Sequence, residues 1–160
     1  FDAGLRTPIL IRWDGRAKPA THKAPVSSID ILPTLLAATR LAKDSERFPG
    51  RNLWPSATGK ITLDANRAVF GEIYPGDASS LGHPEQDVAH RWVRRDNLKL
   101  ITTHKHGASH SWGSYLKGDA LYDVVADSTE SRNLIGKRKF ETDVANLRKE
   151  LNDWWNPDSD

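Results

Sequence analysis

The sequence predicts a mixed α/β protein whose C-terminal part is a small antiparallel sheet covered by a helix. Two strand-like runs, residues 89–95 and 98–103, flank the turn formers Asp96 and Asn97. Two turn residues between two such runs are typical of a hairpin with a tight turn. Residues 137–156 carry an apolar stripe at helical spacing, so we expect this helix to cover one face of the sheet.

The other elements of the C-terminal part follow from similar patterns. Residues 68–74 and 120–125 are short runs rich in strand formers, and we expect both to be strands. The stripe of the last helix recurs at spacings of four and three residues: Phe140, Val144, Leu147, Leu151 and Trp154. Pro157 follows this stripe and is expected to end the helix.

The N-terminal part predicts one strand, one helix and a linker. Residues 7–13 form a short apolar run, and Asp14 with Gly15 ends it in a turn. A continuous apolar strand is typical of a sheet covered on both faces, so this strand requires neighbours, which the segment need not supply. Without them, we expect residues 9–11 to be exposed or mispaired. A helix is expected to begin close to Pro33, because proline is tolerated only near a helix start. Residues 47–59 contain two prolines and two glycines, and they are the best candidate for a linker.

The helix near Pro33 is predicted to have a capped start and an apolar face. Three side chains that can accept hydrogen bonds from a first helical turn precede it: Ser27, Ser28 and Asp30. Leu32, Leu35 and Leu36 share one face at helical spacing. We expect that face to pack in the core.

The composition is that of a globular protein. Of the 160 residues, 38% are hydrophobic and 28% are charged, which argues against a disordered or membrane-embedded chain. No apolar run approaches the roughly 20 residues that span a bilayer. The 23 basic and 21 acidic residues are mixed, and no sustained basic stripe predicts nucleic-acid binding. The absence of cysteine excludes disulfides, thiolate catalysis and cysteine-based zinc sites in this segment.

The first residues indicate a segment of a longer protein. The sequence begins with Phe1 and lacks the basic segment followed by an apolar stretch that a secretory signal requires. We interpret the N-terminus as a cut made inside a longer chain. The segment itself therefore carries no address for a compartment.

Two N-terminal segments resemble the sulfatase family. Residues 1–15 resemble the family segment Tyr-Glu-Gly-Gly-x-Arg-x-Pro, followed by a strand and Trp-Pro-Gly. This chain has Asp2 for the glutamate, Ala3 for the first glycine and Asp14 for the proline. Residues 26–36 are similar to the family segment at the start of the following helix.

Two C-terminal segments extend this resemblance in the same order. Residues 93–101 resemble the hairpin of the family's small C-terminal domain. Residues 121–134 resemble its Leu-Tyr-Asp-Leu, Asp-Pro, Glu and Asn-Leu pattern, with Ser128 in place of the proline. The order and spacing of the four segments are specific and span almost the whole chain.

The resemblance implies a two-domain fold. Sulfatases join a large α/β domain, like that of alkaline phosphatase, to a small domain with an antiparallel sheet of about four strands and a C-terminal helix. Residues 1–58 would be the last strand–helix unit of the large domain. Residues 59–160 would be the small domain.

The resemblance also implies the chemistry of the full-length enzyme, a sulfuric ester hydrolase. Family catalysis uses a formylglycine made from the first residue of a Cys/Ser-x-Pro-x-Arg segment. It also uses a calcium ion held by Asp and Asn side chains, together with Lys and His. This sequence has no such segment, and the last catalytic lysine would precede Phe1. We therefore expect no catalytic residue, metal ligand or bound cofactor here, and no turnover by this segment alone.

A histidine-rich loop is the most suggestive polar feature. His104, His106 and His110 lie close together after the second strand of the predicted hairpin. A zinc or nickel site is one interpretation, although the loop lacks a nearby carboxylate. A solvated loop is another. A contribution to a substrate pocket is the third, because long loops beside a cleft often carry specificity.

Two further side chains complete the predicted substrate-binding set. Trp112 offers a flat apolar face to a sugar ring, and packing in the fold is the alternative. Arg6 has a guanidinium that can pair with a substrate anion, and a structural salt bridge is the alternative. The whole set is Arg6, His104, His106, His110 and Trp112.

We expect the C-terminal part of a sulfatase that acts on a sulfated sugar or an aryl sulfate. The segment would support the fold and border the substrate cleft, with the upstream large domain as its partner. By resemblance, the full protein would be periplasmic or secreted. One alternative is a phosphoester or phosphonate hydrolase of the alkaline phosphatase superfamily. Another is a non-catalytic carbohydrate-binding or structural module.

Overall fold

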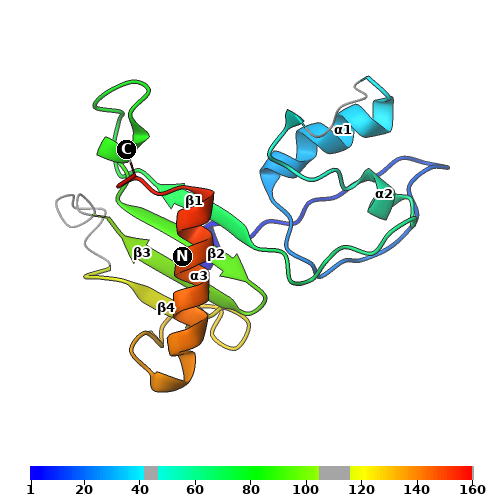
Figure 1. Cartoon of the computed structure of the whole chain (residues 1–160). Helices are drawn as coiled ribbons and strands as arrows, with labels where there is room; N and C mark the ends of the chain where they lie inside the picture. Colours follow the sequence, from blue (N-terminus) through cyan, green and yellow to red (C-terminus); the bar gives the residue numbers. More distant parts are fainter. Residues whose placement is uncertain (42–46, 105–115, 160) are drawn as a thin grey trace. The chain divides into compact units, whose positions relative to one another are not determined.

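The chain folds into two compact units (Figure 1). The computed structural model describes residues 1–41, 47–104 and 116–159. Residues 1–6 and 68–160 form one unit, here called the sheet unit, and residues 7–67 form the other, here called the helical unit. The division therefore falls between Arg67 and Ala68, and it assigns the first six residues to the sheet unit. The domain limits 1–58 and 59–160 stay a prediction.

The sheet unit contains a four-stranded antiparallel sheet in the order β1-β2-β3-β4. Its strands are these: β1 (Val69–Ile73), β2 (His90–Arg95), β3 (Leu98–Thr103) and β4 (Ala120–Asp123). Arg95 pairs with Leu98 across the turn at Asp96 and Asn97, so the predicted hairpin is confirmed. The four-stranded sheet with its C-terminal helix also confirms the fold class expected for the small domain.

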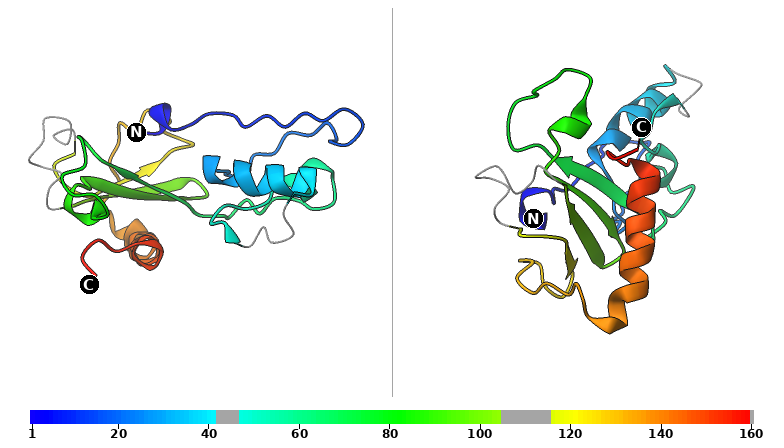
Figure 2. Two further views of the ribbon diagram at one scale, coloured as in Figure 1. Left: turned by 90° about the horizontal axis from the view of Figure 1, so that it is seen from above. Right: turned by 60° about the vertical axis from the view of Figure 1, so that its left-hand side comes forward.

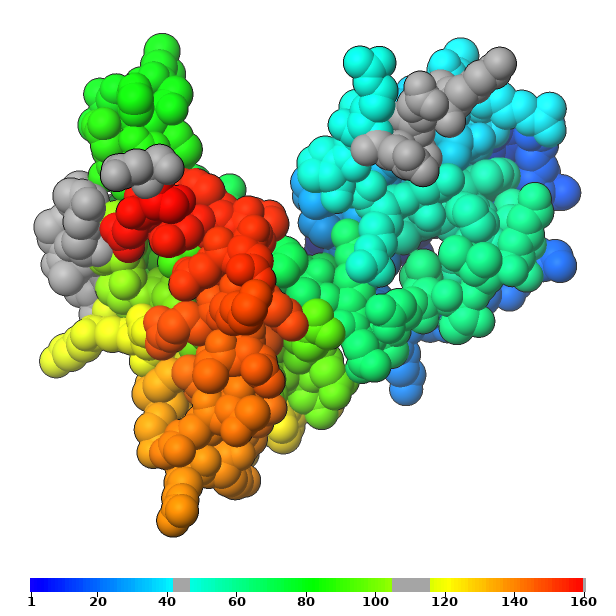
Figure 3. Space-filling view, in the orientation of Figure 1, coloured from blue at the N-terminus to red at the C-terminus, as the bar shows by residue number. Residues whose placement is uncertain are grey.

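Helix α3 (Glu141–Trp154) covers one face of this sheet, as predicted. Leu147 and Leu151 of α3 form an apolar core with side chains of β2, β3 and β4: Val93, Leu100 and Leu121. In the space-filling view, atoms of α3 conceal much of this face (Figure 3). Trp154, expected in the core stripe, is 42% exposed and stacks on Phe70 with ring centroids 5.2 Å apart. The stripe therefore ends at Leu151, and Trp154 lies at the rim.

The opposite face of the sheet has a second apolar cluster and is covered by the first residues of the chain. The cluster consists of Ile101, Ala120, Tyr122 and Val124, with Trp92 packed against it. Phe1 meets Tyr122 edge to face at 6.2 Å, and the short turn η1 (Asp2–Gly4) follows. Seen from above, α3 and the N-terminus lie on opposite sides of the sheet (Figure 2). A Cβ at Gly71 would lie 2.5 Å from Cζ2 of Trp92, so glycine is needed where the indole packs on β1.

The helical unit is built around α1 (Ile31–Thr39) and the single turn α2 (Trp54–Ala57). The residues of α1 that are buried are Pro33, Thr34 and Ala38. The expectation that Leu32 and Leu35 face the core is wrong for the described chain, because they are 50% and 56% exposed. The buried side of α1 instead receives the segment at Leu53, whose backbone N–H donates to the Thr34 hydroxyl at 2.8 Å.

The predicted strand at residues 7–13 is not formed. These residues have no strand structure, and Leu10 is 89% exposed. Among the described residues, the four strands of the sheet pair only with one another. None of them is a neighbour of the apolar run at residues 7–13. A formed strand is therefore the wrong prediction for this chain, because a strand pattern does not say whether a partner strand is present. The expectation that residues 9–11 are exposed without sheet partners is confirmed at Leu10 and Ile11, which are 89% and 39% exposed.

Candidate functional site

Of the five predicted substrate-binding residues, the structure describes two. His106, His110 and Trp112 lie outside the described residues. Arg6 belongs to the N-terminal segment, where its guanidinium pairs with Asp2 Oδ2 at 2.8 Å and its side chain is 51% exposed. His104 follows β3 and is buried. The structure does not bring these two side chains together, because Arg6 and Asp2 lie on the face away from α3.

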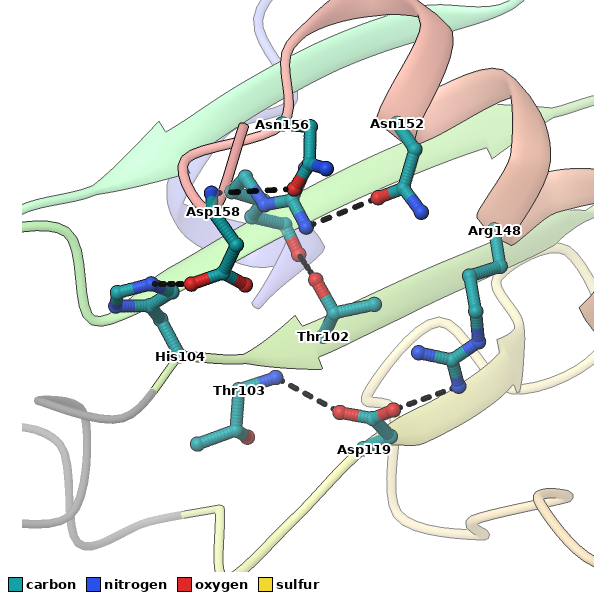
Figure 4. Close-up of a pocket in the computed structure, with 9 residues that line it drawn as sticks. Thr102, Thr103, His104, Asp119, Arg148, Asn152, Asn156 and Asp158 are labelled. Carbon is teal, nitrogen blue, oxygen red and sulfur yellow. Dashed lines mark hydrogen bonds and ion pairs between the residues drawn. The ribbon is translucent and has the colours of Figure 1, made fainter. Parts of the chain in front are cut away.

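A polar pocket lies where β3 ends, beside α3 and the segment that follows it (Figure 4). Its volume is about 290 Å³. The lining residues come from the hairpin and the residue after it, the residue before β4, α3 and the segment that follows α3: Arg91, Thr102, Thr103, His104, Asp119, Arg148, Asn152, Asn156 and Asp158. His104 is thus the one predicted site residue that lines it.

Hydrogen bonds hold one side of this pocket through Asp119. One carboxylate oxygen of Asp119 accepts from the Thr103 backbone N–H at 2.8 Å, and the other pairs with Arg148 Nη2 at 2.7 Å. Both contacts appear in the close-up (Figure 4). A carboxylate that bridges a strand end and a helix fixes the distance between them, so this wall of the pocket is preorganised.

The other side of the pocket is held by Arg91 and His104. The Arg91 guanidinium donates to Asn152 Oδ1 at 3.1 Å and to the carbonyl oxygen of Trp155. Burial lowers the pKa of Arg91, and the nearby carboxylates of Asp158 and Asp119 oppose that effect. His104 Nε2 lies 3.3 Å from Asp158 Oδ1 and ties the last turn of the chain to the end of β3.

Most of the residues that line this pocket were not predicted from the sequence. Arg148 and Asn152 are four residues apart on a confirmed helix, so they share a face. Arg91 and Thr102 are direct partners across the hairpin. The sequence predicts that the members of each of these two pairs lie close together. It does not predict which face of the helix packs on which face of the sheet.

A second polar cluster is buried on the opposite face of the sheet. Lys99 is 1% exposed, and its Nζ lies 3.0 Å from Glu130 Oε1 and 3.4 Å from Asp2 Oδ1. Glu130 also accepts from the backbone N–H of Asp2. Lys99 further lies over the ring of Trp92, 5.3 Å from its centroid. Fully buried lysines are rare unless paired, so this cluster fastens the first residues of the chain to β3.

A third polar cluster stabilises the helical unit. Asp30 is fully buried, forms an ion pair with Arg67, and accepts from the backbone N–H groups of Ser27 at 2.9 Å and Arg51 at 2.7 Å. Burial raises the pKa of Asp30, but Arg67 and these two N–H groups outweigh burial and hold the pKa below its usual value. Asp30 does not form the expected cap on α1, which has no side-chain capping hydrogen bond; its carboxylate accepts instead from Ser27, before the short turn η2 (Ser28–Asp30).

The carboxylates of the second and third clusters are held in ion pairs. Among residues 1–41, 47–104 and 116–159, no three His, Asp or Glu side chains are grouped as a metal site would need. Lys99 pairs with both Asp2 and Glu130, and Arg94 also lies near Asp2. Asp30 pairs with Arg67. In the same described residues, no helix is both long and apolar enough for a membrane span.

Comparison of the sequence with known families and proteins confirms the resemblance. Residues 1–156 match the family described as "N-sulphoglucosamine sulphohydrolase, C-terminal". A sulfatase of Schizosaccharomyces pombe is 29% identical over 96% of this chain and 25% of its own length. An ulvan-active sulfatase of Formosa agariphila is also 29% identical, over 95% of this chain and 27% of its own length. The chain thus spans about a quarter of the length of these relatives.

Solved structures share the fold. A structure described in complex with its substrate D-glucosamine-2-N,6-O-disulfate has a TM-score of 0.54 and 22% identity, over 81% of this chain and 24% of that one. A phosphonate monoester hydrolase from Silicibacter pomeroyi has a TM-score of 0.54 and 20% identity, over 82% of this chain and 25% of that one. At these identities the likeness concerns the fold alone. The match over residues 1–156 is decisive: the chain belongs to the N-sulphoglucosamine sulphohydrolase C-terminal family of sulfatases.

Proposed function

We propose that this chain is the C-terminal part of a sulfatase that hydrolyses sulfate esters of a sugar. The observation that carries the proposal is the family match over residues 1–156. The relative that acts on ulvan and the fold neighbour bound to a disulfated glucosamine support a saccharide rather than an aryl sulfate as the natural substrate. Export to the periplasm or the exterior is part of the same proposal, by resemblance to the family.

The role we assign to the segment is support of the fold and one border of the substrate cleft. Cleavage of a sulfate ester needs an activated oxygen nucleophile, and cations that hold the sulfate oxygens. The cations of the described clusters already have partners: Lys99 lies between two carboxylates, and Arg148 pairs with Asp119. We therefore assign the calcium ligands and the residue that becomes formylglycine to other parts of the full protein.

The test compares the 160-residue chain with the full protein that contains it. Sulfate release is measured from a sulfated glucosamine and from an aryl sulfate, with and without a calcium chelator. We expect release by the full protein, loss of release with the chelator, and no release by the segment alone. A full protein that cleaves a phosphonate ester in preference to the sulfate esters would contradict the sulfatase proposal.

The assay of the segment alone tests where the catalytic residues lie. Calcium-dependent turnover by these 160 residues would refute the placement of catalysis elsewhere. Inactivity of both proteins on every ester would instead favour a module that only binds carbohydrate or supports structure.

A further inference from the structure

The polar pocket at the end of β3 has features of a small binding site. All nine of its lining residues are polar or charged, and they come from four parts of the sheet unit. Its volume of about 290 Å³ lies just below the range of about 300–1,000 Å³ for small-molecule sites. The pocket therefore has room for one small ring, and its walls offer hydrogen bonds rather than apolar contact.

The charges that line the pocket balance. Two guanidinium groups, Arg91 and Arg148, face two carboxylates, Asp119 and Asp158. Arg148 is paired with Asp119, and Arg91 donates to an amide oxygen and a carbonyl. Sulfate recognition requires cations whose charge is not already compensated. The pocket is thus better suited to a neutral ligand than to a free anion.

The hydrogen-bonding groups in the pocket suit hydroxyls. Asn152 uses its Oδ1 to accept from Arg91, and Asn156 uses its Oδ1 to accept from the Asp158 N–H at 3.2 Å. Their oxygens are thereby oriented, and each side-chain amide carries N–H donors besides. The amides of Asn152 and Asn156 stand side by side in the pocket, and the carboxylates of Asp158 and Asp119 line it as well (Figure 4). A hydroxyl group donates and accepts at once, so a ring with several hydroxyls can match such a wall.

We propose that this pocket binds one neutral, hydroxyl-rich sugar ring. The assignment to a saccharide, as opposed to another polyol, rests on the proposed function, in which the substrate is a sulfated sugar. In that case the pocket holds an unsulfated ring of a longer saccharide. For a single ring we expect a millimolar dissociation constant, because few atoms make contact.

Nuclear magnetic resonance of the 160-residue chain tests this proposal without any turnover. The chain is labelled with nitrogen-15 and titrated separately with N-acetylglucosamine, D-glucosamine-2-N,6-O-disulfate and inorganic sulfate. We expect N-acetylglucosamine to shift the side-chain amide signals of Asn152 and Asn156 and the backbone signal of His104. Inorganic sulfate is expected to leave these signals in place.

Two variants and a matched control locate the binding. Asn152→Leu removes the amide and is expected to weaken N-acetylglucosamine binding about tenfold, as for the loss of one hydrogen bond. Asn152→Asp keeps an oxygen that can accept from Arg91, so this variant is expected to stay folded. It should weaken N-acetylglucosamine binding as well, because it also removes the amide. Asn146→Leu changes an exposed asparagine on the same helix and should bind like the unmodified chain.

The possible outcomes separate this proposal from the proposed function. A folded spectrum without shifts on addition of N-acetylglucosamine overturns the neutral-sugar pocket, as does a stronger response to sulfate alone. Equal binding by the Asn152 variants and the control overturns it too. None of these results affects the sulfate-release assay, and failure of that assay leaves the measured sugar binding intact.

Discussion

The two units of the chain differ in how completely their apolar surfaces are covered. In the sheet unit, α3 covers one face of the sheet, and the first six residues lie on the other. In the helical unit, α1 buries Pro33, Thr34 and Ala38, while Leu32 and Leu35 on its other side remain half exposed. The apolar run at residues 7–13 has no sheet partner among the described strands.

The two units are therefore stabilised by different forces. The sheet unit has a closed apolar core on each face, to which burial contributes roughly 25 cal/mol per Å². The helical unit relies on a buried ionic and hydrogen-bonded cluster at Asp30, with little apolar burial around it. Substitutions of the same kind should therefore have unequal effects in the two units.

The largest effect is expected for Lys99→Met in the sheet unit. The substitution leaves the buried carboxylates of Glu130 and Asp2 without their shared cation, which costs about 3–5 kcal/mol when a buried pair is broken. Chemical denaturation followed by circular dichroism measures the loss. The control Lys149→Met removes an exposed lysine and should leave the midpoint unchanged. Equal midpoints for both variants would show that the Lys99 cluster does not stabilise the sheet unit.

A matched pair of leucines, one in each unit, tests whether only the sheet unit has a closed apolar core. Leu100→Ala in the core of the sheet unit should lower the free energy of unfolding by about 2–5 kcal/mol. Leu10→Ala in the helical unit should change it by no more than about 0.5 kcal/mol, because Leu10 is 89% exposed. Differential scanning calorimetry compares the two. A loss at Leu10 as large as that at Leu100 would mean that the helical unit has a closed core as well.

Acid should weaken the helical unit through Asp30. The folded pKa of Asp30 is lowered, so its carboxylate stabilises the fold above the unfolded pKa of about 3.9 and loses that contribution as the pH falls further. Asp30→Asn should remove this acid dependence and cost about 1.5–3 kcal/mol at neutral pH. Amide hydrogen exchange, read separately in α1 and β3, measures it. Asp14→Asn, in an exposed pair with Arg12, is the control, and an equal effect there would refute a special role for Asp30.

The smallest effect is expected at the surface of the sheet unit. Glu150→Gln removes the charge that faces Arg95 at 2.9 Å, where both side chains are partly exposed. Exposed ion pairs contribute less than about 1 kcal/mol, so the thermal midpoint should shift little and the shift should vanish at high salt. A large fall in the thermal midpoint that does not depend on salt would show that this pair contributes as much as a buried ion pair.

The sequence predicted the sheet unit better than the helical unit, for physical reasons. The hairpin at Asp96 and Asn97 and the stripe of α3 are local patterns whose partners lie nearby in the chain. The run at residues 7–13 looks like a strand on local grounds, but a strand forms only with a neighbour. The same limit applies to α1. Its periodicity predicts an apolar face, but it does not show whether another part of the described chain covers that face.

The candidate site was only partly predictable. His104 was identified from its histidine-rich surroundings, and the structure places it in the pocket. Arg91, Asp119 and Asn152 carry no distinctive local motif, and they meet only because α3 packs across the hairpin. The Lys99 cluster was not predicted either, since its two carboxylates lie far from it in the sequence.

The attachment of Asp2 also bears on how the sheet unit folds. Asp2 meets Lys99 across 97 positions of sequence and Glu130 across 128. The site that Asp2 occupies is therefore complete only when β3 and the segment around Glu130 have come together. Contacts of such long range also slow folding, because a large loop must close before they form. We therefore expect residues 1–6 to join the sheet unit late in its folding.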